Sequence, residues 1–275
     1  MRRNPFGSLI LAATVFFGVN ASHAEGPAAV PEIRPGIVQG YLSKDALPDS
    51  AAILPPPPSV GSAAEELDRD AARASLTLRS TPRWKLAAID ADISFPGAAG
   101  TFSCALGVPV SEQETPYLYQ MLRRVLTDAG YATFSAKDKY RQARPFMLDG
   151  APTCTPDKEE DLRSNGSYPS GHSSVGWAWA LVLAEATPDR ATAILERGRA
   201  FGESRVVCNV HWESDVEEGR IVGAATVARL HAEPAFLRDL EAAKVELNTV
   251  REKKLAPQRD CQFEGQALVQ APQSQ

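Results

Sequence analysis

The segment that most constrains the fold is a turn-forming run that leads directly into an apolar helix. Residues 166–172 read GSYPSGH, and residues 173–184 read SSVGWAWALVLA. Pro169 fixes the backbone at the start of the turn, and Gly171 removes the side chain that would block close backbone approach. The first turn of a helix leaves free N–H groups at its positive end, which makes an anion site. Because His172 stands at this helix start, the segment predicts the floor of a phosphate-binding site.

The N-terminus has the pattern of a secretory signal peptide. Arg2 and Arg3 precede an apolar run at 8–19 that is too short to span a bilayer as a helix, and residues 22–24 read SHA. Small residues at these positions suit a signal peptidase, so residues 1–24 are expected to be removed after Ala24. An uncleaved anchor is the alternative, but no charged stop-transfer flank follows the run.

Charge and length limit the possible functions of the mature chain. The full chain of 275 residues has a net charge of -5, and removal of Arg2 and Arg3 takes it to -7. An acidic exported protein has no general attraction to nucleic acid polymers or anionic membranes. No other apolar run is long enough and free enough of charge to cross a membrane. The mature length suits one large domain.

The pattern of caps and apolar positions predicts an all-α class, with several helices packed in an orthogonal or bundle-like way. Residues 25–60 are rich in Pro and Ala and are expected to form an extended arm on the surface or on a partner. Residues 61–255 are expected to form the helical domain, and residues 256–275 a polar, frayed tail. Helices are expected at 61–92 with a break at Thr81-Pro82, and at 116–130, 172–186, 187–203, 215–231 and 234–252. The run 206–210 is strand-like but too short to found a sheet.

Two cations precede a proline in the run KDKYRQARP at 137–145. Lys137 and Arg144 are seven residues apart, which places them on one face if the segment is helical, with Arg141 near that face. Pro145 would end the helix at Arg144. Two long cationic side chains could then converge on one point. The alternative interpretation is a solvated basic face.

A histidine and a carboxylate are spaced four apart at His211 and Asp215, after Ser204-Arg205. On a helix they would share a face, and the carboxylate would fix the tautomer and point the other ring nitrogen outward as a nucleophile or base. A purely stabilising hydrogen bond and a zinc site are the alternatives. His231 is interpreted as a helix-end residue with no catalytic part. Ser170 lies outside the G-x-S-x-G pattern of serine hydrolases.

Three motifs occur in one order: Lys137 and Arg144-Pro145, then PSGH at 169–172, then SR at 204–205 with His211 and Asp215. This combination resembles the signature of the phosphatidic acid phosphatase type 2 and vanadium haloperoxidase superfamily. The runs LPPPP at 54–58 and GESRVVCNVHWESD at 202–215 look like the bacterial class A non-specific acid phosphatases. The resemblance covers roughly residues 40–250 and includes every fixed motif position.

The resemblance implies an all-helical, periplasmic phosphatase that needs neither metal nor other cofactor and is often a homodimer. Its substrates would be small phosphate monoesters, including nucleotides, taken with broad specificity. A mildly acidic optimum is expected because His172 must hold its proton in the free enzyme, which the cationic cluster opposes and bound phosphate favours. His211 would attack phosphorus and form a phosphohistidine, Asp215 would orient it, and His172 would protonate the leaving alkoxide. The phosphate oxygens would be bound by Lys137, Arg144, Ser170, Gly171 and Arg205.

Four cysteines remain in the mature chain, and an even number in an exported protein suggests two disulfides with three possible connectivities. A metal site would lack the usual C-x-x-C pair. If the motifs resembled here meet at one site, Cys154 and Cys208 come close together. This predicts a Cys154–Cys208 bond and leaves Cys104 to pair with Cys261.

Other functions remain possible at this point. A vanadium-dependent haloperoxidase could use the same cations and His211, because vanadate mimics the phosphate transition state. A lipid phosphatase would ordinarily have membrane helices, which the sequence lacks. A non-catalytic phosphate-binding protein would need the cations, but not a histidine held by an aspartate opposite a second histidine.

Overall fold

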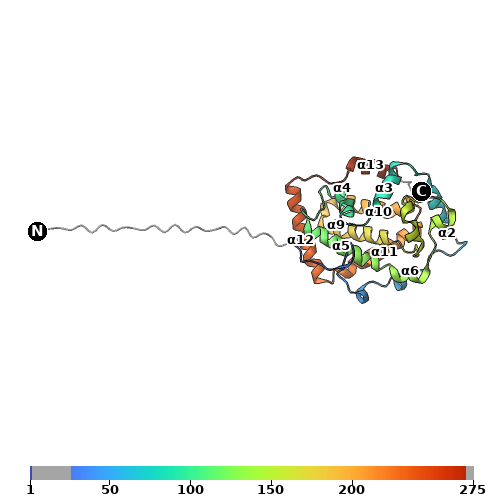
Figure 1. Cartoon of the computed structure of the whole chain (residues 1–275), viewed down its shortest axis with the longest axis horizontal. Helices are drawn as coiled ribbons and strands as arrows, with labels where there is room; N and C mark the ends of the chain where they lie inside the picture. The colour runs from blue at the N-terminus through green and yellow to red at the C-terminus, as the bar shows by residue number, and fades with distance from the viewer. Residues whose placement is uncertain (2–25, 271–275) are drawn as a thin grey trace.

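The computed structural model describes Met1 and residues 26–270, and it is built almost entirely from helices (Figure 1). A short antiparallel pair of strands lies near the start, β1 (Glu32–Arg34) and β2 (Ile37–Val38). The α-helices are α1 (Ser50–Ile53), α2 (Ala63–Leu76), α3 (Pro82–Asp90), α4 (Ser103–Leu106), α5 (Pro116–Tyr131), α6 (Phe134–Tyr140), α7 (Pro145–Asp149), α8 (Glu159–Arg163), α9 (Gly171–Ala186), α10 (Ala191–Val207), α11 (Glu213–Leu230), α12 (Pro234–Glu252) and α13 (Cys261–Val269). Four 3₁₀ turns join them: η1 (Lys44–Ala46), η2 (Gly97–Phe102), η3 (Pro156–Lys158) and η4 (Pro188–Arg190). The predicted all-α class is confirmed.

Two sequence predictions concern membranes and export. The predicted signal peptide falls, apart from Met1, outside the described residues. Within the described chain, no helix combines the length and the apolar character needed to cross a bilayer.

Helix α9 forms the centre of the molecule because its sequence is apolar on nearly every side. A helix of this kind is stable only when other elements cover it all round. Helices α5, α10 and α11 pack against it (Figure 1). Trp179 is fully buried among them, and its indole Nε1 donates to the carbonyl oxygen of Leu122 at 2.8 Å. The middle of this buried helix is therefore held in a fixed place.

A glycine brings the first turns of α11 against the start of α9. A Cβ atom at Gly219 would lie 2.5 Å from the carbonyl oxygen of Ser170, which is closer than real atoms approach. The neighbouring backbones are also joined directly, since the Ser170 N–H donates to the carbonyl oxygen of Asp215 at 2.8 Å. This contact places the Asp215 motif beside the turn that precedes His172.

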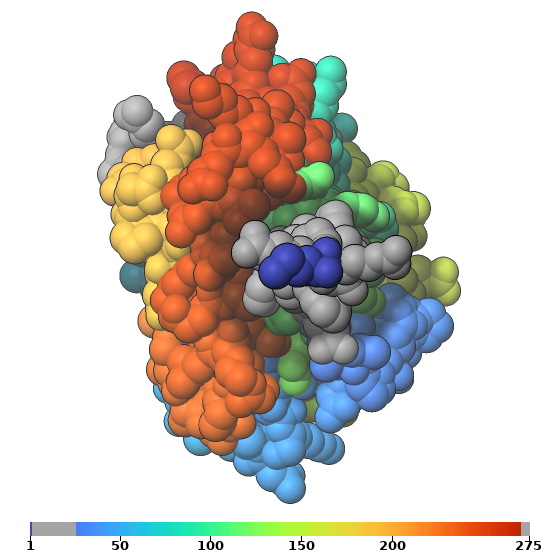
Figure 2. Space-filling model, turned by 90° about the vertical axis from the view of Figure 1, so that its left-hand side faces the viewer, coloured from blue at the N-terminus to red at the C-terminus, as the bar shows by residue number. Residues whose placement is uncertain are grey.

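The N-terminal arm differs from the extended segment that its composition predicts, because it folds onto the helical body. Val38, Leu42 and Leu54 are buried, and the N–H groups of Tyr41 and Leu42 donate to the carboxylate of Asp128 on α5. The Tyr41 hydroxyl also donates to Asp239 of α12 at 2.6 Å. Figure 2 shows the face along which α12 runs, in orange to red, with the arm in blue beside it.

The C-terminal segment was expected to be a frayed polar tail, but residues 261–269 form helix α13. A disulfide joins Cys261 to Cys104, with Cα atoms 5.4 Å apart. Glu264 is buried and forms an ion pair with Arg197 of α10, with Oε2 3.2 Å from Nε. These two long-range contacts hold the helix on the body, and composition alone does not reveal them.

The strand-like run at 206–210 is not a strand. Helix α10 continues to Val207, and the chain then turns through Asn209, whose φ of 59° lies in the left-handed region. The second disulfide, Cys154–Cys208, has its Cα atoms 4.7 Å apart and ties this turn to the segment after α7. Both disulfides follow the pairing expected from the motifs.

Candidate active site

The three motifs meet where the end of α6, the turn before α9 and the connection between α10 and α11 come together. The side chains of Lys137, Arg144, Arg205, His211 and Asp215 are all buried there. The charges of Lys137, Arg144 and Arg205 lower the pKa values of neighbouring groups in this cluster. The structure therefore brings together residues that lie up to 78 positions apart in the sequence.

His211 and Asp215 are in contact, although they do not share a helix face as predicted. His211 lies before α11, Trp212 caps that helix, and Asp215 stands in its first turn. The ring Nδ1 of His211 is 3.0 Å from Oδ2 of Asp215, which also accepts the N–H of Trp212 at 2.9 Å. Because a carboxylate accepts, Nδ1 carries the proton and Nε2 keeps its lone pair. This is the tautomer that a nucleophilic Nε2 requires.

Arg144 faces the other ring nitrogen of His211. Its Nη1 lies 3.1 Å from Nε2 of His211 and donates to the carbonyl oxygen of Val210 at 2.8 Å. Its Nη2 donates to Oδ1 of Asn165 at 2.7 Å, and its Nε donates to the carbonyl oxygen of Leu162 at 2.8 Å. The guanidinium group is thus fixed by neutral acceptors and keeps its whole positive charge beside the histidine.

The helix expected to join Lys137 to Arg144 is interrupted. Helix α6 ends at Tyr140, Arg141 has a φ of 45°, and Arg144 caps the separate helix α7. Lys137 nevertheless reaches the same turn, because its Nζ donates to the carbonyl oxygens of Gly166 at 2.8 Å and Ser167 at 3.1 Å. The alternative of a solvated basic face is wrong, since Lys137 is 7% exposed and Arg144 is 2% exposed.

Arg205 is the cation with the greatest unused hydrogen-bonding capacity. It is 2% exposed, yet its Nε and Nη1 have no acceptor within the part of the chain that the structure describes. A buried donor without an acceptor costs free energy, and more so when the group is charged. These N–H groups are available to the oxygens of a bound anion.

The turn before α9 supplies further hydrogen-bond donors. Ser170 is the N-cap residue, and its Oγ accepts the N–H of Ser173 at 3.3 Å, so its own hydroxyl proton remains free to donate. The N–H of Gly171 lies in the first helical turn, where no intrahelical acceptor is available. His172 follows, and its Nε2 lies 3.0 Å from the carbonyl oxygen of Ala91. Since a carbonyl only accepts, this nitrogen carries a proton.

The electrostatics of the site favour an anion. Burial lowers the pKa of Arg205 to about 9 and that of Arg144 to about 10, and in Arg205 the charge of Arg144 adds to this effect. Burial, and then Arg144, also lowers the pKa of Lys137, whereas burial raises the pKa of Asp215. Three cations thus face a single carboxylate, so a bound dianion would relieve their mutual repulsion.

The surroundings of both histidines favour the neutral ring. Burial lowers the pKa of His211 well below its usual value, and the charges of Arg144, Lys137 and Arg205 lower it further. Burial and then the charge of Arg205 do the same to the pKa of His172. A neutral His211 can attack phosphorus. A neutral His172 can act as a general acid only after a bound anion has raised its pKa or the substrate has supplied the proton.

Two buried residues that support the site, Asp90 and Arg197, were not identified from the sequence. Arg197 pairs with both carboxylate oxygens of Asp90, at 3.1 and 2.5 Å, and Ser204 donates to the same carboxylate at 2.7 Å. Asp90 directly precedes Ala91, which accepts from His172, and Ser204 directly precedes Arg205. Asp90 and Arg197 belong to no motif, and a pair 107 positions apart leaves no local pattern in the sequence.

This group should be important for stability. We expect Asp90→Asn to lower the free energy of unfolding by about 3–5 kcal/mol, because it removes one partner of a buried ion pair. Asp189→Asn is the matched control, since Asp189 pairs with Arg251 on the surface with its side chain 66% exposed, and should cost less than about 1 kcal/mol. Urea denaturation of both variants measures the difference. Equal losses would contradict a structural role for Asp90.

The zinc alternative would need three protein ligands at one site. Among the described residues, no group of three or more His, Cys, Asp and Glu is placed to hold a metal ion. His231, which a three-histidine zinc site would need, lies at the end of α11 and pairs instead with Glu185, with Nε2 2.8 Å from Oε2.

Comparisons with known proteins agree with these observations. Residues 117–235 match the model of the PAP2 superfamily. The chain is 45% identical over 207 residues to a non-specific acid phosphatase of Providencia stuartii, covering 75% of this chain and 84% of the relative. It is 45% identical over 212 residues to a non-specific acid phosphatase of Salmonella typhimurium, covering 77% and 85%. An acid phosphatase of Zymomonas mobilis is 38% identical over 209 residues, covering 76% and 79%.

Proposed function

The chain belongs to the PAP2 superfamily and is an acid phosphatase, and we propose that it hydrolyses small phosphate monoesters without a metal, through a phosphohistidine on His211. One observation carries the mechanism. Nε2 of His211 lies 3.1 Å from the Arg144 guanidinium while Asp215 holds the opposite nitrogen. In this arrangement Nε2 accepts a hydrogen bond from Arg144. A bound phosphoryl group would draw that N–H onto its own oxygen and leave the Nε2 lone pair free to attack phosphorus.

In the first step, Nε2 of His211 attacks phosphorus and the ester P–O bond breaks. The leaving oxygen takes a proton from His172, so the alcohol departs neutral. Because the carbonyl of Ala91 holds the proton on Nε2 of His172, we assign the transferred proton to Nδ1. Asp215 stabilises the positive charge that develops on the His211 ring.

In the second step, water attacks the phosphorus of the phosphohistidine. His172, now neutral, takes a proton from that water, and the P–N bond breaks to return His211 and free phosphate. The same residue thus acts first as an acid and then as a base. No group besides substrate and water is consumed.

The buried cations stabilise the transition state. Phosphoryl transfer spreads negative charge over three equatorial oxygens, and catalysis depends mainly on positioning and on neutralising that charge. Lys137, Arg144 and Arg205 supply three positive charges, and the Gly171 N–H and Ser170 hydroxyl supply neutral donors. These groups can provide the charge that a divalent metal provides in other phosphatases, which supports the proposal of metal independence.

The proposal is tested by hydrolysis of an aryl phosphate at mildly acidic pH, before and after dialysis against EDTA. We expect equal rates. Loss of activity that zinc restores would contradict the metal-free mechanism, and absence of phosphate release under all conditions would contradict the function itself.

The value of kcat/KM should fall about tenfold per pH unit as the pH rises above roughly 6, the second pKa of a phosphate monoester. The low pKa of His172 means that its proton must arrive with the substrate monoanion, whose share decreases as pH rises. At the acid end, the raised pKa of Asp215 makes its carboxylate lose charge at a higher pH than an ordinary aspartate does. Measuring kcat/KM against pH with an alkyl phosphate tests both the decline at high pH and the decline at low pH. A flat profile between pH 5 and pH 8 would contradict this assignment.

Three further properties stay predictions. Export to the periplasm depends on a signal sequence at 1–24, of which the structure describes only Met1. Hydrolysis of nucleotides and assembly as a homodimer come from the family resemblance. Size-exclusion chromatography with light scattering measures the oligomeric state directly.

A further inference from the structure

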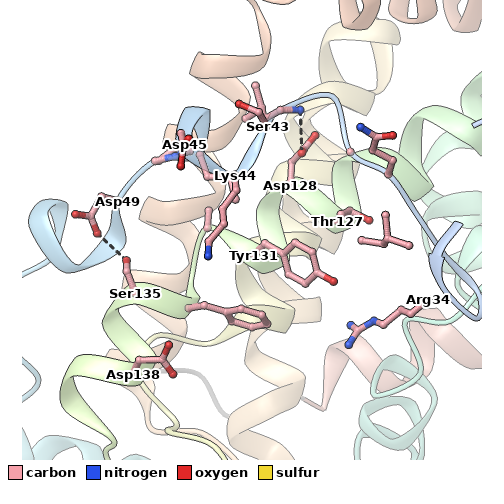
Figure 3. Close-up of a pocket in the computed structure, with 18 residues that line it drawn as sticks. Arg34, Ser43, Lys44, Asp45, Asp49, Thr127, Asp128, Tyr131, Ser135 and Asp138 are labelled. Atoms are coloured by element: carbon pink, nitrogen blue, oxygen red, sulfur yellow. Dashed lines mark hydrogen bonds between the residues drawn. The ribbon is translucent and has the colours of Figure 1, made fainter. Parts of the chain in front are cut away.

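The two catalytic histidines have different surroundings. A cavity of about 160 Å³ has Lys137, Gly171 and His172 in its wall, and a second cavity of about 1030 Å³ lies between the N-terminal arm and helices α5 and α6 (Figure 3). His211 and Asp215 are buried and line neither of these cavities. Because the leaving group departs opposite the nucleophile in an in-line displacement, the smaller cavity marks the leaving-group side. The position of the His211–Asp215 pair is thus set by packed protein groups.

Helix α2 packs against the start of α11 with an unusual set of buried residues. Its buried positions are Asp68, Ala72 and Ser75, which share one face of the helix. Asp68 is only 4% exposed, whereas the adjacent Leu67 is 69% exposed. A helix that packed by its apolar residues alone would bury the leucine and expose the aspartate. Polar contacts therefore determine which face of α2 turns inward.

These polar contacts reach both ends of the connection that carries His211. Oδ1 of Asp68 accepts the N–H of Ser214 at 2.8 Å, and Oδ2 accepts the Ser214 hydroxyl at 2.6 Å. The Ser75 hydroxyl donates to the carbonyl oxygen of Ala72 and also lies 3.1 Å from that of Val206. Helix α2 thus holds the chain before and after His211, and Ser214 directly precedes Asp215.

The start of α11 needs an acceptor from another part of the chain. An N-cap side chain usually accepts the N–H of the second or third helical residue. The N-cap residue of α11 is Trp212, whose indole is only a donor and is bonded to the carbonyl oxygen of Ala143 at 2.8 Å. Ser214 is the second residue of the helix, and Asp68 accepts its N–H from 146 positions away. Asp68 therefore takes the place of a cap and adds a negative charge, which suits a helix N-terminus.

Stability alone does not account for an aspartate at position 68. Burial raises the pKa of Asp68, although both contacts with Ser214 lower it. A raised pKa in the folded protein means that the charged carboxylate makes folding less favourable at neutral pH than an unperturbed one would. The group is held where its charge is disfavoured, and its two hydrogen bonds to Ser214 are what it supplies there.

From these contacts we propose that Asp68 is a positioning residue, which holds Ser214 so that the carboxylate of Asp215 stays against the ring of His211. The inference rests on the proposed function, because it concerns the nucleophile of the same reaction. Asp215 lies one residue after Ser214, and its Oδ2 is 3.0 Å from Nδ1 of His211. Without Asp68, the first turn of α11 is free to shift, and Nε2 of His211 loses its alignment with phosphorus.

Asp68→Ala should lower kcat on an aryl phosphate about 10- to 100-fold with KM within about twofold, because a misplacement of about 1 Å is enough for such a loss. The cations that bind phosphate are unchanged in this variant. Asp68→Asn should keep kcat within about threefold of wild type, since its amide can accept the N–H of Ser214 and donate to the hydroxyl. Asp70→Ala is the matched control on the same helix. Asp70 pairs with Arg73 and its side chain is 60% exposed, so kcat should stay within about twofold.

Proton NMR measures the geometry of the pair without any turnover. The hydrogen-bonded proton on Nδ1 of His211 should give a line downfield of the amide region, assigned by its absence in His211→Ala. We expect this line to shift or to disappear by exchange in Asp68→Ala. It should keep its wild-type position in Asp68→Asn and Asp70→Ala.

Wild-type kcat in Asp68→Ala would overturn the proposal, and so would a loss of kcat that leaves the NMR line unshifted. If Asp68→Ala does not fold, Ser214→Ala replaces it, because that variant removes the hydroxyl contact and keeps the backbone one. Its kcat should fall about three- to tenfold, again through misplacement of the pair. Wild-type kcat with an unshifted line in Ser214→Ala would then overturn the role of Asp68. If the wild-type protein hydrolyses no phosphate ester, the proposed function fails, whereas the NMR line still decides whether Asp68 holds the pair.

Discussion

His211→Ala should lower kcat on an aryl phosphate by about 10⁴-fold or more, to the level left by binding and charge stabilisation alone. The variant lacks the nitrogen that attacks phosphorus, and no second nucleophile replaces it in the mechanism. His211 is 2% exposed and contacts Asp215 and Arg144. Because the side chain is buried in the site, its removal should lower kcat while leaving the protein surface unchanged. Steady-state kinetics measures the loss, and circular dichroism checks that the fold is retained.

His231→Ala is the matched control for this variant. His231 lies at the end of α11 with its side chain 39% exposed, and it pairs with Glu185. We expect kcat to stay within about twofold of wild type, as for surface substitutions away from the site. Comparable losses in the two variants would contradict a nucleophilic role for His211.

His172→Ala should lower kcat by about 10²–10⁴-fold on an alkyl phosphate, which is the usual contribution of a general acid. The loss should be much smaller on nitrophenyl phosphate, because a nitrophenolate leaves without needing a proton. His172 lines the cavity on the leaving-group side, which gives this dependence a structural basis. The measurement is kcat across a series of esters whose alcohols differ in acidity.

The result on the two extreme esters separates two roles for His172. Equal losses on the alkyl and nitrophenyl esters would mean that His172 binds the phosphate rather than protonating the alcohol. His172→Asn gives a second comparison, since it keeps a hydrogen-bond donor for the carbonyl of Ala91 but cannot act as an acid at neutral pH.

The sequence predicts the buried central helix and the turn at its start because each has a local cause. The apolar run after His172 must be buried, and the turn GSYPSGH must lie at its start. The order of the three motifs predicts which residues meet. The structure places Lys137, Arg144, Arg205, His211 and Asp215 together and joins Cys154 to Cys208.

Predictions from local sequence were wrong where contacts between distant residues determine the backbone conformation. The interval from Lys137 to Arg144 looks helical, but the turn at 166 packs against it. A Cβ at Gly166 would lie 2.8 Å from the carbonyl oxygen of Lys137 and 3.0 Å from Cα of Arg141. Arg141 adopts a left-handed conformation beside this turn, and the helix ends. Helical periodicity within one segment contains no information about such a neighbour.

The two ends of the chain show the same limitation. Pro and Ala content predicts an extended arm, yet Asp128 captures two backbone N–H groups of that arm from 86 and 87 positions away. The polar composition after 256 predicts fraying, yet a disulfide and a buried glutamate fix α13. A single buried partner can thus outweigh the composition of a whole segment.

The most direct test of the mechanism is rapid acid-free quenching of the enzyme with a phosphate-labelled substrate, at times shorter than one turnover, followed by peptide mapping. We expect acid-labile, base-stable label on His211, at a level that rises before free phosphate appears. Label on any other residue, or release of phosphate in the first turnover with none bound to the protein, would contradict it.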